Sequence, residues 1–199
     1  MVVAVDAKTE FVIQAGARLP LGNSPNETVE GRIAPLERVL AYRNPDVIDR
    51  FLDEFDLPRA HAEEIFREML RWLWLCAKRR VDLAGGRHGA LPRLLLLDDL
   101  YAVDQMWHAF IVFTDEYIRF CNTRFGFYIH HYPITTEERR RERQRWETSP
   151  EDARQERREM LSGVYGYIHD ELGAPILKKW CEEFPVKYSK NQLKTLHRN

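Results

Sequence analysis

The stretch AEEIFREMLRWLWLC, residues 62–76, decides the fold of this chain. Its apolar residues recur at intervals of three and four positions, the spacing that places side chains on one face of an α-helix. The residues on this face are Ala62, Ile65, Phe66, Met69, Leu70, Leu73 and Cys76. Trp72 and Trp74 widen the face, while Glu63 and Glu64 lie near its start and basic residues follow it, as the helix dipole favours. The pattern predicts a long amphipathic helix over residues 58–82 that packs into a core.

The next apolar stretch, residues 98–125, predicts a second central helix. It is rich in aromatic and aliphatic side chains, and Asp98 and Asp99 supply negative charge at its start. Gly126 interrupts the pattern at the other end. A helix this apolar belongs in the interior, so we expect one continuous helix from Asp98 to Phe125 at the centre of the core.

Weaker helical signals lie on both sides of these two stretches. Asn44-Pro45 and Ser149-Pro150 each combine a capping residue with proline at the first helical position. Further helical patterns cover residues 33–40 and 175–183, whereas residues 1–30 show little periodicity, and their short apolar groups fit either strands or an extended arm. The sequence therefore predicts an all-α single compact domain of about six helices over residues 31–186. An extended or flexible N-terminal arm (1–30) and a basic C-terminal tail (187–199) flank it.

Composition limits the classes of function. The 199 residues contain 30 Lys and Arg against 31 Asp and Glu, a net charge of −1. This balance excludes the strongly basic surface on which nucleic-acid binding depends. No window of about 18 apolar residues occurs, so we expect no membrane span. Cys76, Cys121 and Cys181 are odd in number and form no C-x-x-C pair, which indicates free thiols and a cytoplasmic protein.

Residues 137–159 hold eight acidic and eight basic residues. Such a balanced stretch is typical of a solvated helical pair with ion pairs at intervals of three or four positions. The arginines within residues 139–145 offer an alternative interpretation, a surface for an acidic protein partner.

Asp104 and His108 are the residues best suited to carry chemistry. Four positions apart on a helix, they share a face, where both reach one divalent ion or the carboxylate orients the imidazole. His130 and His131 point in opposite directions in an extended segment, so at most one of them joins the pair, and we expect His130. Two histidines and one aspartate suit iron, zinc or copper. The sequence thus predicts a divalent transition-metal site at Asp104, His108 and His130.

Other interpretations of the same residues stay open. A buried structural pair between Asp104 and His108 explains their spacing without a metal, and haem ligated by His108 is a further alternative. Asp115 shares the helical phase of the pair and extends a polar stripe. At about 100° per residue, Tyr117 and Cys121 fall on other sides of a straight helix, so we expect Tyr117 to pack elsewhere and Cys121 to be a core thiol.

These features favour a small metal-dependent protein, a non-haem oxidoreductase or hydrolase that acts on a small molecule or a peptide. Water or substrate would take an open position on the metal, and peptide modification in a biosynthetic pathway would suit a protein of this size. The chain contains no G-x-S-x-G, P-loop or G-x-G-x-x-G motif. The alternative is a non-catalytic helical interaction module, in which the Asp104–His108 pair is structural and residues 137–159 contact a partner.

The segment DQMWH, residues 104–108, followed by Tyr117 and Cys121, resembles the D-x-x-W-H…Y-x-x-x-C signature of the glycine-rich domain-containing protein-like family. LRWLWL at residues 70–75 and FG at 125–126 with HHYP at 130–133 look like bacterial relatives of that group. The resemblance covers about residues 60–135 and implies a helical domain without a defined activity. The family pattern usually reads W-H-x-H. Phe110 stands at the second His position here, so an inherited metal site needs His130 or His131 as replacement.

Overall fold

The computed structural model describes residues 12–13, 33–86, 91–96 and 98–198 of the chain. Almost all of the regular structure in this part is helical, which confirms the predicted all-α class. The expected N-terminal arm over residues 1–30 lies outside the described residues except for Val12–Ile13. These two residues form strand β1, which pairs antiparallel with β2 (Leu95–Leu96).

The described helices are more numerous and shorter than the six that we expected. In chain order they are α1 (Leu36–Leu40), α2 (Pro45–Glu54), α3 (Arg59–Ala84), the 3₁₀ turn η1 (Asp98–Leu100), α4 (Tyr101–Val112), α5 (Thr114–Phe125), α6 (Thr136–Thr148), α7 (Pro150–Leu172), α8 (Ala174–Lys178), the π-helical turn η2 (Lys179–Glu183), α9 (Phe184–Lys187) and α10 (Lys190–Thr195).

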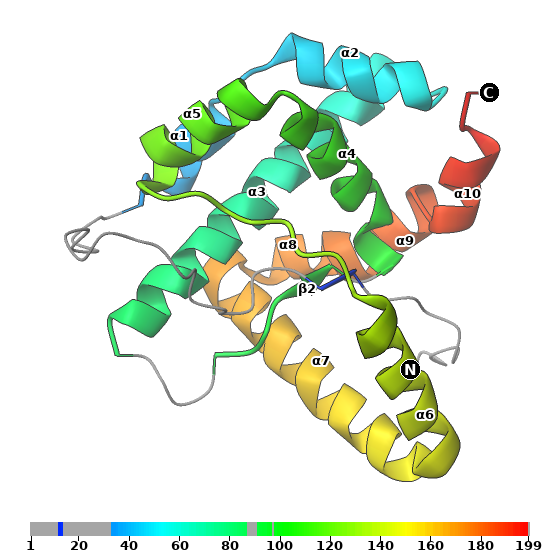
Figure 1. Ribbon diagram of the computed structural model, residues 1–199. Coiled ribbons are helices and arrows are strands. Elements are labelled where there is room, and N and C mark those ends of the chain that lie inside the picture. Colours follow the sequence, from blue (N-terminus) through cyan, green and yellow to red (C-terminus); the bar gives the residue numbers. More distant parts are fainter. Residues whose placement is uncertain (1–11, 14–32, 87–90, 97, 199) are drawn as a thin grey trace.

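Helix α3 is the helix predicted over residues 58–82, and it crosses the middle of the molecule (Figure 1). Its predicted apolar face is fully or almost fully buried, and α1, α2 and α4 pack against it. Gly85 follows as the C-cap. Each large apolar side chain buried in this way contributes about 1.5–3 kcal/mol. The other helices therefore assemble around α3.

The prediction of one continuous helix over Asp98–Phe125 is wrong. The chain breaks at Phe113, whose φ of −83° and ψ of 64° are not helical, and α5 then leaves in a different direction from α4 (Figure 1). The break allows aromatic side chains on either side of it to pack together. The rings of Phe110 and Tyr117 meet edge to face, with their centroids 5.1 Å apart. Apolar residues continue through the break at their former density, so their periodicity does not reveal the turn.

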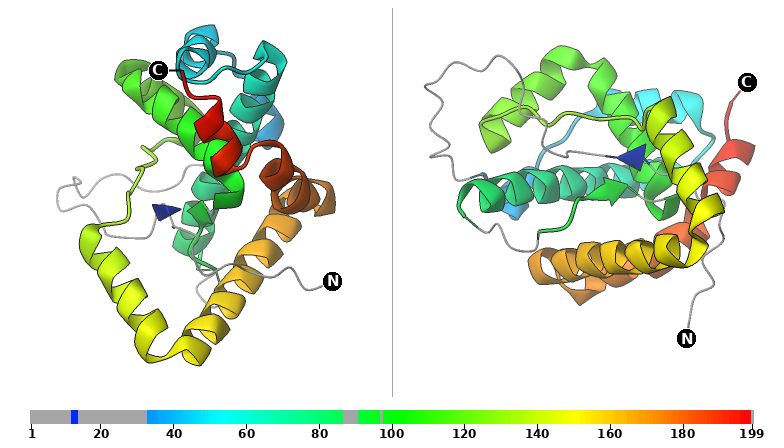
Figure 2. Two further views of the ribbon diagram at one scale, coloured as in Figure 1. Left: turned by 90° about the vertical axis from the view of Figure 1, so that its right-hand side faces the viewer. Right: turned by 60° about the horizontal axis from the view of Figure 1, so that its bottom comes forward.

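Helices α6 and α7 form the helical pair predicted from the charged segment, and Figure 2 shows them as two arms of a V. Thr135 begins α6 with a capping box, in which its hydroxyl accepts from the Glu138 N–H and the Glu138 carboxylate accepts from the Thr135 N–H. Glu137 pairs with Arg140 and Arg141 along the same helix. No residue of α6 is buried, and exposed pairs of this kind stabilise a helix only weakly.

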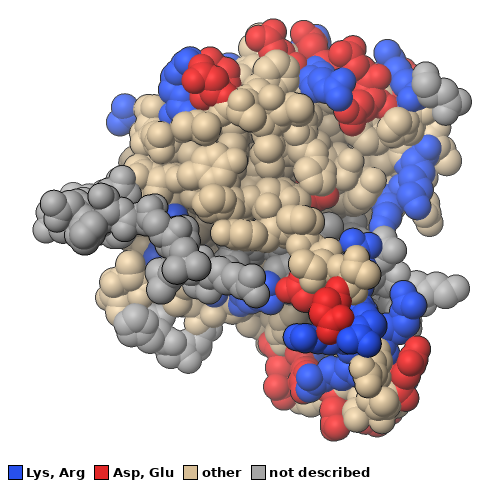
Figure 3. Space-filling view, in the orientation of Figure 1, with Lys and Arg blue, Asp and Glu red and all other residues tan. Residues whose placement is uncertain are grey.

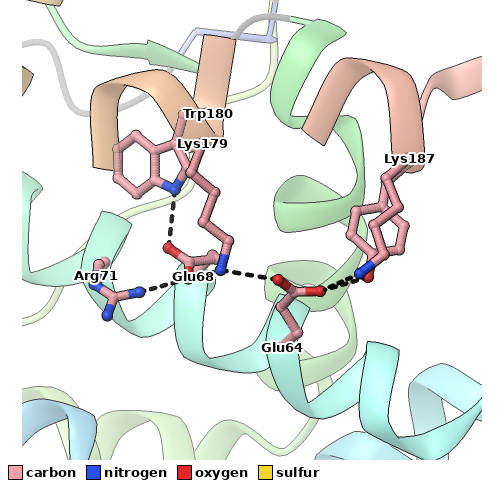
Figure 4. Close-up of polar contacts among 7 residues, drawn as sticks. Glu64, Glu68, Arg71, Lys179, Trp180 and Lys187 are labelled. Atoms are coloured by element: carbon pink, nitrogen blue, oxygen red, sulfur yellow. Dashed lines mark hydrogen bonds and ion pairs between the residues drawn. The ribbon is translucent and has the colours of Figure 1, made fainter. Parts of the chain in front are cut away.

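A buried carboxylate joins the C-terminal elements to α3 (Figure 4). Glu68 is completely buried and accepts hydrogen bonds from Lys179 Nζ at 2.8 Å and Trp180 Nε1 at 2.9 Å. Arg71 also pairs with it. Both Lys179 and Trp180 belong to η2, so the π-helical turn presents two neighbouring donors to one acceptor on α3.

Glu64, one turn earlier on α3, makes the second link. Its carboxylate accepts from Lys187 Nζ and Tyr188 Oη, each at 2.7 Å, and pairs with Lys179 at 2.9 Å (Figure 4). Partial burial raises the pKa of Glu64, but the hydrogen bonds from Lys187, Lys179 and Tyr188 outweigh burial and hold the pKa at about 2. The carboxylate is therefore ionised over the whole physiological range.

The segment expected to be a basic tail, residues 187–199, continues the helical fold as far as it is described. Ser189 begins α10 with a capping box, and Leu193 is fully buried. The backbone N–H of Asp56 donates to the Leu196 carbonyl at 2.7 Å, which ties this end to the residues after α2. Although this segment is basic overall, it contains apolar side chains, such as Leu193, that are buried in the core. Within the described residues, no helix is both long and apolar enough to cross a membrane.

Candidate metal centre

Helix α4 brings Asp104 and His108 to one face, as their spacing predicted. Asp104 is buried, whereas half of the His108 side chain is exposed. His108 Nδ1 lies 3.6 Å from Asp104 Oδ2, too far for a good direct hydrogen bond. Two polar side chains thus lie at the boundary between the core and solvent, with the carboxylate on the inner side.

The third member of the cluster is His131, whereas we expected His130. His131 Nε2 lies 2.9 Å from Asp104 Oδ1, and its ring centroid is 4.5 Å from that of His108. The His130 ring instead contacts Tyr128 and Tyr132, with centroids at 4.7 and 5.5 Å. The connection between α5 and α6, which carries both histidines, crosses in front of α3 toward α4 (Figure 1).

The alternating directions of side chains along this connection explain why His131, and not His130, joins the cluster. This alternation was a signal available in the sequence. Side chains two positions apart in extended backbone share a face. Ile129 is an apolar residue and is buried, so His131 shares its inward direction while His130 faces outward with the neighbouring tyrosines. Assigning the direction from Ile129 would have selected His131.

The three side chains lie close enough together to be candidate ligands of one small cation. Ligand atoms offered by Asp104, His108 and His131 all lie within 4.8 Å of one another. Two ligand atoms that bind one ion at about 2.0–2.1 Å lie roughly 2.8–3.4 Å apart at octahedral or tetrahedral angles. The measured separations of 2.9 and 3.6 Å to the two Asp104 oxygens fall within or just above this range.

Gln105 is a neighbour of the site that sequence reasoning missed. Its Nε2 donates to Asp104 Oδ2 at 3.3 Å and lies 3.5 Å from His108 Nδ1. A side-chain amide between a carboxylate and an imidazole restrains the orientation of both groups. Gln105 lies three positions before His108, a spacing at which helical side chains are neighbours, so the sequence contained a signal for this contact.

The electrostatic setting keeps His108 available as a ligand. Partial burial lowers the pKa of His108 from its ordinary value of 6.5, and nearby His131 acts in the same direction, although the Asp104 carboxylate opposes both. The imidazole is therefore neutral at pH 7 and retains the lone pair that metal coordination needs.

We expected Tyr117 to pack on another side of a straight helix than His108, and its hydroxyl contacts Trp107, the residue before His108. The Trp107 indole Nε1 donates to the Tyr117 hydroxyl at 2.9 Å, and this hydroxyl donates to the Ile129 carbonyl at 2.7 Å. The expectation assumed a straight helix, and the break at Phe113 brings Tyr117 back toward Trp107.

The polar stripe proposed through Asp115 does not form. The Asp115 side chain is 85% exposed and pairs with Arg119, because it lies on α5, beyond the break. Cys121 is fully buried, as expected of a core thiol, and burial raises its pKa to about 11. The thiol is therefore protonated at neutral pH.

The surroundings of the site carry little charge. Figure 3 shows the face on which α4, α5 and the α5–α6 connection lie as largely uncharged. Charged side chains gather along the upper edge of this view and at the lower right, where α6 lies. In this view the uncharged surface over α4 and α5 therefore borders the charged region of α6.

Comparison with known proteins identifies the family to which the chain belongs. No curated protein and no solved structure matches the chain significantly. The expected relation to the glycine-rich domain-containing protein-like family is wrong, because the family model that matches is a different one. This model, UCP032817-like, describes an uncharacterised family and matches residues 57–159, which include helices α3 to α6 and the whole metal-site cluster. Since the match spans more than half of the chain, the protein belongs to the UCP032817-like family.

Proposed function

We propose that the protein binds one divalent transition-metal ion through Asp104, His108 and His131. The observation that carries the proposal is the convergence of these three side chains within 4.8 Å, from α4 and from a connection 27 positions away from Asp104. A buried carboxylate beside two imidazoles is a set that iron, zinc and copper favour. His131 replaces His130, the third ligand expected from the sequence.

We further propose that the metal has a catalytic role as a non-haem centre. Three protein ligands leave positions for water or substrate, whereas structural zinc sites use four. The side chains of Asp104 and His131 are 3% and 9% exposed, but that of His108 is 50% exposed, so the open positions would face solvent on the His108 side. The largely uncharged face around α4 supports a neutral small molecule or a peptide as substrate (Figure 3). Three free thiols, two of them buried, support a reducing compartment such as the cytoplasm.

The test is metal binding by untagged protein. Purified protein is dialysed against Fe²⁺ without oxygen, Zn²⁺ or Cu²⁺, and bound metal is measured by elemental analysis. We expect one ion per chain. His108→Ala and His131→Ala should each abolish stoichiometric binding, because each removes one of three ligands. His130→Ala is the matched control, since it removes the adjacent histidine, which faces away from Asp104, and it should bind like the wild type.

Circular dichroism establishes that each variant is folded before its metal content is compared. Absence of stoichiometric metal in folded wild-type protein would contradict the proposal. Equal loss of metal in the His130 and His131 variants would contradict the assignment of ligands, because the two side chains point in opposite directions.

The second candidate function is a protein-interaction role for the α6–α7 hairpin. The observation that favours it is that α6 buries none of its residues and carries a row of arginines. Replacing Arg139, Arg140 and Arg143 by glutamine should weaken capture of a partner without reducing metal content. An unchanged set of captured proteins would remove this surface from consideration.

A further inference from the structure

The connection that carries His131 lacks a backbone scaffold of its own. Among the described residues, no backbone–backbone hydrogen bond involves residues 127–134. The segment is neither helix nor strand, and it joins the end of α5 to the cap of α6. A metal ligand on irregular backbone needs side chains from elsewhere to hold it in place.

Ile129, two residues before His131, is the point nearest to His131 at which a buried side chain hydrogen-bonds to the backbone of the connection. Its carbonyl accepts the hydroxyl proton of Tyr117 at 2.7 Å, and that hydroxyl accepts the indole N–H of Trp107 at 2.9 Å. Trp107 and Tyr117 are fully buried. The Tyr117 hydroxyl thus has its donor and one acceptor position engaged by groups from two different segments.

Trp107 also contacts one of the candidate ligands directly. Trp107 precedes His108 on α4, and its ring meets the His131 ring edge to face at 4.8 Å. Cys121, one turn after Tyr117 on α5, interacts with the backbone of Ile129 through its thiol. Side chains of both α4 and α5 therefore contact the short segment that carries His131.

We propose that Tyr117 is a positioning residue, which fixes His131 against Asp104 through the Trp107–Tyr117–Ile129 hydrogen bonds. Its effect on metal affinity rests on the proposed function, whereas its effect on the position of His131 does not. Without the hydroxyl, a buried carbonyl and a buried indole N–H lose their partner, and the connection is free to shift relative to α4.

Tyr117→Phe is the decisive variant, since it removes the hydroxyl and keeps the ring. We expect its affinity for Zn²⁺, measured by competition with a chromophoric chelator, to fall roughly tenfold or more, the usual effect of losing a group that orients a ligand. In metal-free protein, the imidazole ¹⁵N and ¹H resonances of His131 should shift and broaden. A residue that only stabilised the fold would leave both readouts unchanged in the folded protein.

Two controls separate positioning from general loss of stability. Tyr128→Phe removes a hydroxyl from a ring that contacts Tyr117 edge to face at 5.2 Å, without touching the Ile129 carbonyl. Val164→Ala destabilises the buried core at α7, outside the metal-site cluster. Both should keep wild-type zinc affinity and wild-type His131 resonances. Trp107→Phe removes the donor to Tyr117 and should act in the same direction as Tyr117→Phe if the latter folds poorly.

The outcomes distinguish this inference from the proposed function. If the wild-type protein binds no zinc, the proposed metal site is refuted. The His131 resonances of the variants then test the positioning role of Tyr117 by themselves. Folded Tyr117→Phe and Trp107→Phe proteins with unchanged His131 resonances would overturn the inference. Unchanged zinc affinity in these variants, with a wild type that binds zinc, would overturn it as well.

Discussion

Replacing Glu68 by alanine tests how the C-terminal elements are held to the core. The carboxylate is completely buried on α3 and accepts from Lys179 and Trp180 of η2 and from Arg71 of its own helix. Glu68→Ala leaves the Trp180 indole N–H without an acceptor inside the protein, because Trp180 is also buried. It also leaves two cations without the carboxylate that neutralised them.

The expected cost follows from these partners. Removing one partner of a buried ion pair costs about 3–5 kcal/mol. The lower end, about 3 kcal/mol, applies here because Lys179 and Arg71 remain 22% and 16% exposed and Lys179 keeps Glu64 at 2.9 Å. Glu68→Gln retains the shape and an oxygen for Trp180, so the loss should be about 1–2 kcal/mol.

Urea denaturation followed by circular dichroism measures these differences. The midpoint should fall in the order wild type, Glu68→Gln, Glu68→Ala, with an unchanged dependence of the unfolding free energy on urea. Arg145→Ala is the control, because its partner Glu156 and Arg145 itself are both half exposed, and it should cost under about 1 kcal/mol. A Glu68→Ala loss no larger than that of Arg145→Ala would refute the reasoning.

Three further perturbations follow from the fold. The pKa of Glu64 is held at about 2, below its ordinary value of 4.5, so its contribution to stability is present above pH 4.5 and is lost as the pH falls toward 2. In acid denaturation, the stability of Glu64→Gln should therefore fall less steeply between pH 4.5 and about 2 than that of the wild type. Identical curves would contradict this assignment of the pKa. Asn44→Ala removes the side-chain oxygen that accepts from the Val47 N–H and should cost about 1 kcal/mol in urea denaturation, whereas Asn44→Asp keeps the cap. Gly126→Ala should cost about 1 kcal/mol in thermal or urea unfolding, because φ is +77° at this C-cap while the space for a Cβ is open. If the stability of Gly126→Ala equals that of the wild type, α5 ends in a different backbone conformation in solution.

Local sequence patterns predicted much of the secondary structure. The spacing of apolar residues over 62–76 identified α3, and Asn44-Pro45 and Gly85 marked a start and an end that the structure confirms. Charge alternation over 137–159 indicated a helical pair, which α6 and α7 form. These features depend on contacts within one or two helical turns, so they can be read directly along the chain.

The break at Phe113 could not be read in this way, because the apolar pattern continues through it. The capping pair of Ser189 and Gln192 was a local signal for the start of α10, but only the burial of Leu193 shows that this helix joins the core. Apolar periodicity reports that a residue is buried but not which element covers it.

The same division applies to the candidate metal centre. The sequence by itself determined that Asp104 and His108 share a helix face, because four residues make about one turn. Only the tertiary structure decided that the segment carrying His131 lies against α4, and that the Tyr117 hydroxyl donates to the Ile129 carbonyl of this segment. The reason is physical: spacing along a helix follows from its covalent geometry, whereas the position of an irregular segment is decided by which distant groups accept and donate its hydrogen bonds.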